Sequence, residues 1–390
     1  MGEAYIVAAT RTAGGRRGGR LAGWHPVDMA AAVLDALIDR SGADPVLVED
    51  VIMGCVGQAG EQAINVARNA VLASRLPLSV PGTSVDRQCG SSQQALHFAA
   101  ATVMSGIMDV VIAAGVESMT RVPIGTAAGL AAKAGLGQPK SPKMESRFPD
   151  VRFNQFVGAE LIAQKHDLNR EALDAYSLES HRRAISAVES GAFDAEILPL
   201  DITLEDGTRS VHRIDEGIRF DVTLEGIRSV KLLREDGRLT AASSSQICDG
   251  ASGVMVVNER GLKTLGVRPL GRIHHMTVSA GDPVVMLEEP LFATERALGR
   301  AGLSIDDIDL YEVNEAFASI PLAWVKHVGA DSARMNVSGG AISLGHPLGA
   351  SGTKLMTTLM HGLHRTRGRF GLQTMCEGGG LANVTIVERL

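Results

Sequence analysis

Two cysteines, one histidine and one asparagine are the residues of this chain whose types and positions could carry out covalent chemistry. Cys89 lies in the stretch Val-Asp-Arg-Gln-Cys-Gly-Ser-Ser at 85–92, between a short β-branched run and an alanine-rich stretch typical of a helix. Backbone N–H groups at a helix start stabilise a thiolate and lower the pKa of the thiol. Cys89 is therefore a candidate nucleophile, and a cysteine that only packs is the alternative.

The other three candidates lie where strands end. Asn314 closes a strand in Val-Asn-Glu-Ala-Phe (313–317), where capping the next helix is its alternative role. His346 lies in Gly-Gly-Ala-Ile-Ser-Leu-Gly-His-Pro-Leu-Gly-Ala-Ser-Gly (339–352), whose glycines allow close approach to a ligand. Cys376 precedes Glu-Gly-Gly-Gly, whose N–H groups could form an oxyanion hole. Together they suit acyl transfer through a thioester, with one thiol as carrier, a base and a second thiol.

An alternation of strands and helices positions these residues. The periodicity predicts strands at 5–9, 51–56, 83–85, 109–114 and 251–257, with helices from 28 to about 41, at 61–73 and at 90–104. The same order recurs in strands at 270–278, 308–313, 334–337, 369–375 and 382–387 and helices at 290–303, 315–328 and 350–363. Continuous apolar strands predict a parallel sheet covered on both faces. The recurrence indicates a duplicated β-α-β-α-β-α-β-β unit, whose helices at 90 and 350 could pack side by side at a pseudo-twofold axis.

The interval 118–246 breaks this alternation with Gly/Pro/Lys-rich loops, helices near 157–165 and 171–189 and hairpin-like segments. We therefore expect an α/β protein with three parts. The first half comprises 1–117 plus 247–267, the inserted loop domain comprises 118–246, and the second half comprises 268–390.

Composition narrows the function classes. The 390 residues carry a formal net charge of −6, which argues against a nucleic-acid binder, and we interpret the Gly/Arg-rich run at 11–20 as a solvated loop. The four cysteines form no CxxC pair, so neither a metal site nor a disulfide framework is expected. No apolar run reaches the roughly 18 residues of a membrane span. A cytoplasmic enzyme is the resulting expectation.

The four motifs, in this order and spacing, resemble those of the thiolases over essentially the whole chain. The resemblance implies a five-layer αβαβα fold of two related halves with an inserted loop domain. It implies that Cys89 is acylated, that His346 is its base and that Cys376 is the acid/base acting on the acetyl-CoA carbon. Asn314, through a bound water, and His346 would form one oxyanion hole, and the N–H groups of Cys89 and Gly378 the other.

The resemblance also implies a ligand and an assembly. Ser245, in Ser-Ser-Ser-Gln-Ile-Cys-Asp-Gly (243–250), matches a serine that contacts the pantetheine arm of coenzyme A. Arg219, in Asp-Glu-Gly-Ile-Arg (215–219), aligns loosely with an arginine that lies against the adenine, and a solvated arginine is the alternative. Coenzyme A would be a co-substrate, with no permanently bound cofactor, and relatives form homodimers or homotetramers.

One departure bears on the substrate. Short-chain acetoacetyl-CoA thiolases carry a His-Met-Gly segment near the acyl pocket, whereas Asn-Gln-Phe-Val-Gly-Ala-Glu stands at 154–160 here. This stretch is similar to thiolases of actinobacterial steroid degradation, which favours cleavage of bulkier 3-ketoacyl-CoA substrates. A biosynthetic thiolase that condenses two acetyl-CoA is the alternative. A non-catalytic acyl-CoA or sterol carrier and a cysteine protease using Cys89, His346 and Asn314 are remoter ones.

Overall fold

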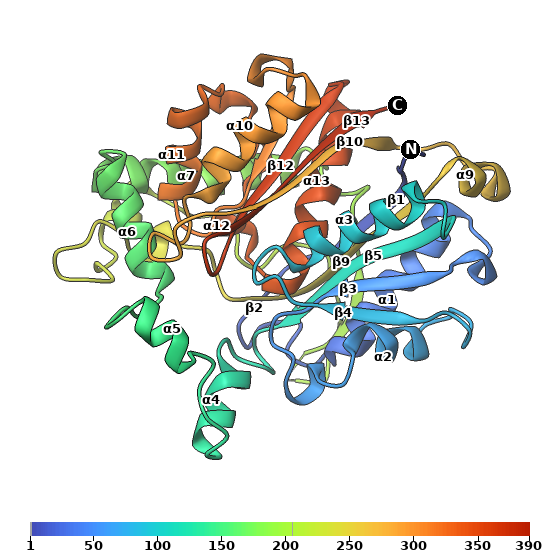
Figure 1. Cartoon of the computed structure of the whole chain (residues 1–390), viewed down its shortest axis with the longest axis horizontal. Helices are drawn as coiled ribbons and strands as arrows, with labels where there is room; N and C mark the ends of the chain where they lie inside the picture. Colours follow the sequence, from blue (N-terminus) through green and yellow to red (C-terminus); the bar gives the residue numbers. More distant parts are fainter. Residues whose placement is uncertain (1, 205) are drawn as a thin grey trace.

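A mixed β-sheet whose two halves are flanked by helices forms the centre of the molecule in the computed structural model, which describes residues 2–204 and 206–390 (Figure 1). Along the sheet the strands follow the order β4-β3-β5-β9-β1-β10-β13-β12-β11. Their bounds are β1 (Tyr5–Thr12), β3 (Asp50–Gly54), β4 (Gly82–Val85), β5 (Val110–Ser118), β9 (Cys248–Val257), β10 (Gly271–Ala280), β11 (Leu310–Val313), β12 (Phe370–Glu377) and β13 (Leu381–Arg389). The halves join where Tyr5 and Ile6 of β1 pair with Arg272 and Gly271 of β10.

Helices make three layers around the two half-sheets. Helices α1 (Pro26–Ser41) and α2 (Val66–Ala73) cover the first half-sheet, and α10 (Glu289–Ala301) and α11 (Ser319–Val328) cover the second. Helices α3 (Ser91–Met104) and α13 (Ser351–Thr366) pack on each other and on strands of both halves. The result is the expected five-layer αβαβα arrangement.

The two central helices lie side by side, as the duplication predicts. A Cβ at Gly352 of α13 would clash with the backbone of Gln93 in α3, so only glycine permits this close approach. The Thr353 N–H donates to Ser92 Oγ at 3.0 Å. The starts of both helices, one following Cys89 and the other following His346, are thereby held together.

The prediction of a parallel sheet is only partly right. The β3–β4, β3–β5 and β11–β12 pairs are parallel, but β9 runs antiparallel to β1 and β5, and β13 runs antiparallel to β10 and β12. The closing strand of each repeat inserts beside its first strand, and this long-range pairing leaves no signal in the local pattern.

The strand predicted at 334–337 is wrong. A 3₁₀ turn (Ser332–Arg334) occupies its start, and Met335 makes one isolated bridge to Tyr311. Asn336 has a φ of 47°, its side chain accepts from the Val313 N–H at 2.9 Å, and it donates to the Val313 carbonyl at 2.9 Å. This amide takes the hydrogen bonds that a further strand would have made with β11.

Two predicted helices begin later than expected. Asn65 takes a left-handed conformation and caps Arg68, so α2 begins at Val66 after a 3₁₀ turn at 60–62. Likewise α11 begins at Ser319 rather than at 315. Asn314 therefore does not cap a helix, and its amide is left for another use.

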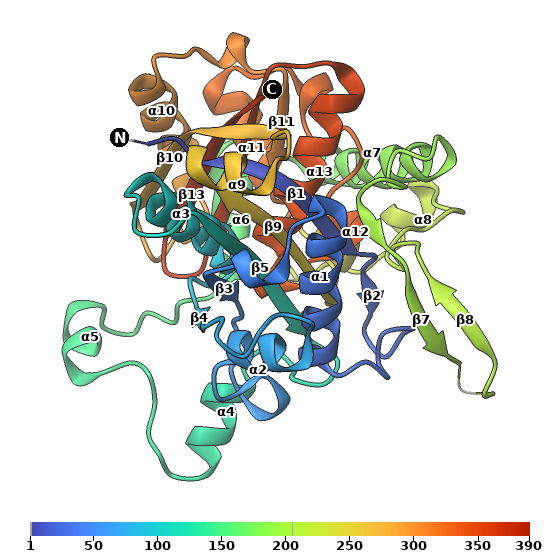
Figure 2. The same cartoon turned by 90° about the vertical axis from the view of Figure 1, so that its right-hand side faces the viewer.

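The inserted segment contains the two expected helices, α6 (Gln155–Lys165) and α7 (Arg170–Glu189), an expected hairpin, and two further helices that the sequence did not predict. Helices α4 (Thr126–Lys133) and α5 (Pro142–Arg147) stand away from the sheet in both views (Figures 1 and 2). Strands β7 (Leu200–Thr203) and β8 (Arg209–His212) form a hairpin that projects in Figure 2. The remaining short elements are β2 (Gly15–Arg16), β6 (Ile197–Leu198), α8 (Leu224–Arg228), α9 (Glu259–Leu265) and α12 (Ala341–Leu344). The proposed domain boundaries stay a prediction.

The solvated loop predicted from residue 11 onward is wrong at its start. Strand β1 continues through Thr12, and the Arg11 side chain is fully buried. Its Nε lies 2.6 Å from Glu196 Oε1 and its Nη1 lies 2.9 Å from Asp215 Oδ1. Both carboxylates come from the inserted segment, so the partners that permit this burial are invisible in the local sequence. No helix within the described ranges is both long and apolar enough to cross a membrane.

Candidate active site

Cys89 lies in a tight turn that connects β4 to α3. Gln88 has a φ of 50°, the Gly90 N–H donates to the Arg87 carbonyl at 3.1 Å, and Ser91 Oγ donates to the Gln88 carbonyl at 2.6 Å. The half-buried Cys89 lines a cavity of about 1080 Å³. The turn thus presents the thiol to a space large enough for a ligand.

The thiol of Cys89 does not have the low pKa expected from its position before a helix. Burial, and then the nearby Glu377 carboxyl, raise the pKa of Cys89 to about 12. Desolvation of the thiolate outweighs the helix-dipole effect, which carries only about half an elementary charge. A base must therefore take the proton of Cys89 during any reaction.

His346 has the protonation state that such a base needs. Burial, and then the Lys354 ammonium, lower the pKa of His346 to about 3, so the ring is neutral at physiological pH. Nδ1 lies 2.5 Å from Ser351 Oγ, and this hydroxyl donates its single proton to the Pro347 carbonyl at 2.9 Å. Nδ1 must then carry the proton, which leaves Nε2 as a free acceptor.

The loop that carries His346 is fixed by backbone contacts. Gly345 has a φ of 79°, and Lys354 Nζ donates to the Leu344 and Gly345 carbonyls at 2.6 and 3.1 Å. The His346 N–H donates to the Gln246 carbonyl at 3.0 Å. The histidine is thereby held between the second half and the inserted segment.

Asn314 lies beside His346. Its Nδ2 is 3.5 Å from His346 Nε2, and both side chains are buried. Asn314 Oδ1 has no hydrogen-bond partner among the described residues. The structure therefore brings the predicted amide and imidazole together, with an amide oxygen left unsatisfied.

Cys376 and the glycine turn at 378–380 approach the Cys89 turn from the second half. Cys376 is buried at the end of β12, and burial followed by the influence of Cys89 raises the pKa of its thiol well above the usual range. A Cβ at Gly378 would lie 3.1 Å from Gln88 Oε1, and Gly378 lines the same cavity as Cys89. The two predicted thiols and the predicted oxyanion-hole backbone thus share one site.

Ser245 is close to this site, and Arg219 is further out. The Ser245 N–H donates to the Ala316 carbonyl at 2.9 Å, next to the Asn314 loop. Exposed Arg219 lines a separate cavity of about 440 Å³ together with Gln246, the neighbour of Ser245. Gln246 therefore connects the neighbourhood of Ser245 to the cavity that Arg219 lines.

Glu117 is a structural member of the site that the sequence reasoning missed. Its buried carboxylate accepts from the N–H groups of Val56, Gly57 and Gly349, each at 2.9 Å, and from Gln62 Nε2 at 2.8 Å. It joins loops of both halves and itself lines the large cavity. Its place three residues after the strand predicted at 109–114 was the available signal.

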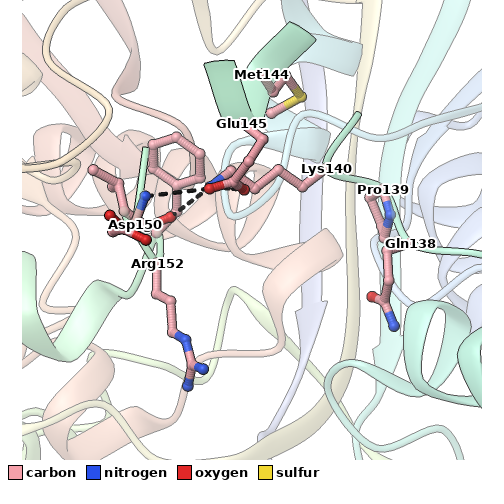
Figure 3. A pocket seen from close by; sticks show the side chains of 9 residues that line it. Gln138, Pro139, Lys140, Met144, Glu145, Asp150 and Arg152 are labelled. Atoms are coloured by element: carbon pink, nitrogen blue, oxygen red, sulfur yellow. Dashed lines mark hydrogen bonds and ion pairs between the residues drawn. The ribbon is translucent and has the colours of Figure 1, made fainter. Parts of the chain in front are cut away.

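The large cavity is mostly apolar and extends from Cys89 to the projecting part of the inserted segment. Its apolar lining includes Val122, Ala128, Phe153, Met286 and Leu348. A neighbouring hollow of about 710 Å³ lies over α5, where Lys140 contacts Glu145 while Arg152 points away from them (Figure 3). No cluster of three or more potential metal ligands occurs within the described part of the chain.

Comparison with known proteins decides the family. The model of the thiolase N-terminal domain matches residues 4–260, and that of the thiolase C-terminal domain matches residues 267–389. The chain belongs to the thiolase family. The predicted family and its acyltransferase class are thus confirmed.

Individual thiolases are similar over the whole length. The chain is 51% identical to the steroid 3-ketoacyl-CoA thiolase FadA6 of Mycobacterium tuberculosis, covering 100% of this chain and 95% of that protein. It is 38% identical to an acetyl-CoA acetyltransferase of Pseudomonas aeruginosa, covering 97% and 98%. The crystal structure of human mitochondrial 3-ketoacyl-CoA thiolase superposes with a TM-score of 0.90 at 32% identity, covering 100% and 99%. The predicted fold class is confirmed by this likeness.

Proposed function

We propose that this thiolase cleaves a 3-ketoacyl-CoA with coenzyme A, giving acetyl-CoA and an acyl-CoA two carbons shorter. Neutral His346 Nε2 takes the proton of Cys89, and the sulfur attacks the 3-keto carbon. The N–H groups of Cys89 and Gly378 hold the oxyanion that develops on the former 3-keto oxygen. The protonated imidazole donates from Nε2, with Asn314 acting through a water, to the thioester oxygen of the acetyl-CoA part, where negative charge develops as the C2–C3 bond breaks. The neutral ring and its free Nε2 support this role.

Breaking of the C2–C3 bond leaves acyl-Cys89 and the carbanion of acetyl-CoA. Cys376 protonates that carbanion, a role supported by a buried thiol that keeps its proton. The resulting Cys376 thiolate takes the proton of incoming coenzyme A, whose sulfur then attacks the acyl-Cys89 carbonyl. The N–H groups of Cys89 and Gly378 hold the thioester oxygen, and His346 returns the proton to Cys89.

The size of the cavity carries the substrate proposal. Its volume of about 1080 Å³ slightly exceeds the roughly 300–1,000 Å³ of drug-sized ligand pockets. An acetyl group would leave most of that apolar surface uncovered, whereas a polycyclic or medium-chain acyl group would fill it. Gln155, from the segment that replaces His-Met-Gly, also lines the cavity. We therefore propose a bulky 3-ketoacyl-CoA of the steroid-degradation type.

A thiolysis panel tests this proposal. Purified enzyme is assayed for kcat/KM with acetoacetyl-CoA, a medium-chain 3-ketoacyl-CoA and a steroid-derived 3-ketoacyl-CoA. We expect the bulky substrate to exceed acetoacetyl-CoA by at least about a hundredfold, because each buried methylene adds roughly 0.8 kcal/mol. A preference for acetoacetyl-CoA would contradict the proposal.

Condensation of two acetyl-CoA molecules is the second candidate, because similar proteins include the Pseudomonas aeruginosa acetyl-CoA acetyltransferase. Acetoacetyl-CoA formation from acetyl-CoA, at a rate comparable to thiolysis of the bulky substrate, would favour it. Coenzyme A binding without turnover of any panel member would favour the carrier function instead.

We further propose that coenzyme A is the co-substrate, with Ser245 on its pantetheine arm and Arg219 by its adenine. The 440 Å³ cavity that Arg219 lines supports this placement.

We also propose a homo-oligomer that forms through a pair of β4 edges. Strand β4 ends the sheet order, and the exposed side chains of Phe98 and Ile107 lie by this edge. Four free cysteines support the reducing cytoplasm as the location.

A further inference from the structure

Glu377 is a buried carboxyl beside the two thiols, and the proposed mechanism gives it no role. Its side chain is fully buried, and neither carboxyl oxygen has a hydrogen-bond partner in residues 2–204 and 206–390. Leaving a buried carboxyl unpartnered costs stability, and ionising it there costs far more. Such a group calls for a functional explanation.

The position of Glu377 joins it to both thiols. It follows Cys376 in β12, and its carboxyl lies against Gly90, the residue after Cys89. A Cβ at Gly90 would clash with that carboxyl, so no side chain can separate Glu377 from the Cys89 turn. Glu377 does not line the large cavity, so within the described chain it acts on the thiols and not on the substrate.

The charges around Glu377 indicate what its ionisation would do. A negative Glu377 raises the pKa of both Cys89 and Cys376, and Asp86 and Glu117 act on Cys89 in the same direction. Burial raises the pKa of Glu377 itself to about 8, which the Arg87 guanidinium opposes in part. The carboxyl is therefore mostly neutral at pH 7 and ionises just above it.

We propose that Glu377 is a positioning residue that sets thiol reactivity: its neutral carboxyl permits the Cys89 thiolate to form, and its ionisation suppresses that thiolate. The inference rests on the proposed nucleophilic role of Cys89. The proton that Glu377 loses goes to solvent, and no covalent bond forms or breaks in this step. The enzyme thus has an alkaline limit set by a carboxyl rather than by a thiol.

Alkylation of Cys89 by iodoacetamide, followed by mass spectrometry from pH 7 to 10, tests the proposal without any substrate. In the unmodified enzyme the logarithm of the rate rises with unit slope up to about pH 8 and flattens over about one further pH unit, because the new charge opposes the thiolate. The substitution E377Q keeps the shape of the side chain but prevents it from becoming negatively charged. Its rate rises without the plateau and exceeds that of the unmodified enzyme by about tenfold at about pH 9.

E312Q is the matched control. Glu312 is likewise buried, has an unpartnered oxygen and has a pKa raised well above the usual range by burial, but it influences neither thiol. E312Q should therefore retain the plateau. A purely structural role of Glu377 would lower the melting temperature of E377Q and leave the plateau in place.

An E377Q curve identical to that of the unmodified enzyme would overturn the proposal. If E377Q does not fold, the alkylation curve of the unmodified enzyme is sufficient. A rate whose logarithm rises with unit slope through pH 9 would show that no negative charge appears beside Cys89 near pH 8. If the thiolysis panel contradicts the proposed substrate, the alkylation test of Glu377 still applies. Absence of any Cys89 alkylation would contradict both the proposed nucleophile and the proposed role of Glu377.

Discussion

At the scale of residues, a half-buried and a buried thiol, both with raised pKa values, and a neutral imidazole leave the three proposed reacting groups uncharged at rest. Cys89 and Cys376 keep their protons, and His346 keeps Nε2 free. Charge then appears only when a substrate carbonyl arrives to accept it. A preformed thiolate, which the helix position predicts, would have to be desolvated in this buried site.

The roles of the two thiols predict separate defects. Radiolabelled acetyl-CoA should label Cys89 in the unmodified enzyme and in Cys376→Ala, and leave Cys89→Ala unlabelled. Thiolysis should fall by at least about a hundredfold in Cys376→Ala, because the carbanion loses its proton donor. Peptide mapping and a thiolysis assay measure the two steps.

The control for this pair is Cys55→Ala, which removes a buried thiol that does not line the cavity. It should retain Cys89 labelling. Equal loss of labelling and of cleavage in Cys376→Ala would refute the division of labour between the two thiols.

At the scale of elements, the paired central helices hold the site together, and the open sheet edge at β4 offers a surface for subunit pairing. The approach of α13 to α3 at Gly352 holds the Cys89 turn and the His346 loop together. Strand β4, by contrast, has a neighbour on one side only among the described strands. An open edge beside exposed apolar side chains is a pairing site that proteins normally cover.

This edge predicts a charge-sensitive oligomer. Phe98→Asp, at a side chain that is 45% exposed beside β4, should convert the assembly to monomers, because a buried unpaired carboxylate is costly. Light scattering measures the mass. Val46→Asp, at a residue that is 61% exposed in the 3₁₀ turn Pro45–Leu47 and does not line the hollow beside β4, is the control and should leave the mass unchanged. A monomeric unmodified protein would reject the proposal.

At the scale of the whole molecule, a buried ion cluster ties the three parts of the chain together. Arg11 of the first half pairs with Glu196 and Asp215 of the inserted segment. Glu196 also accepts from Thr358 of α13 at 3.0 Å, and Lys354 of the same helix lies 3.7 Å from Asp215. The helix that follows the His346 loop is therefore anchored to the rest of the molecule through charges.

Breaking this cluster should destabilise the entire chain. Arg11→Met should lower the free energy of unfolding by about 3–5 kcal/mol, because two buried carboxylates lose their partner. Arg11 holds the pKa of Asp215 below its usual value, so its contribution is present above that usual value and is lost as pH falls through the lowered one. Urea unfolding at pH 7 and at a pH well below 3.8, the usual pKa of an aspartyl carboxyl, should therefore show a smaller difference between variant and unmodified protein at the lower pH.

Arg16→Met provides the comparison. Arg16 also pairs with an acidic residue, Glu216, but its side chain is 70% exposed. An exposed pair of this kind contributes about 0–1 kcal/mol. Equal effects of the two substitutions would show that burial of the Arg11 cluster does not matter.

The sequence by itself determined the residue types of the site, the duplication and most elements, because strand ends, glycine turns and helical periodicity are local properties. Cys89, Asn314, His346 and Cys376 were all found from such signals, and their roles stay proposals. Tertiary structure alone decided the antiparallel insertion of β9 and β13, the burial of Arg11 and the protonation states of the site. Each depends on residues far apart in the chain: the thiol of Cys89 keeps its proton because burial in a site that also contains the Gly378 turn of the second half outweighs the helix start beside it.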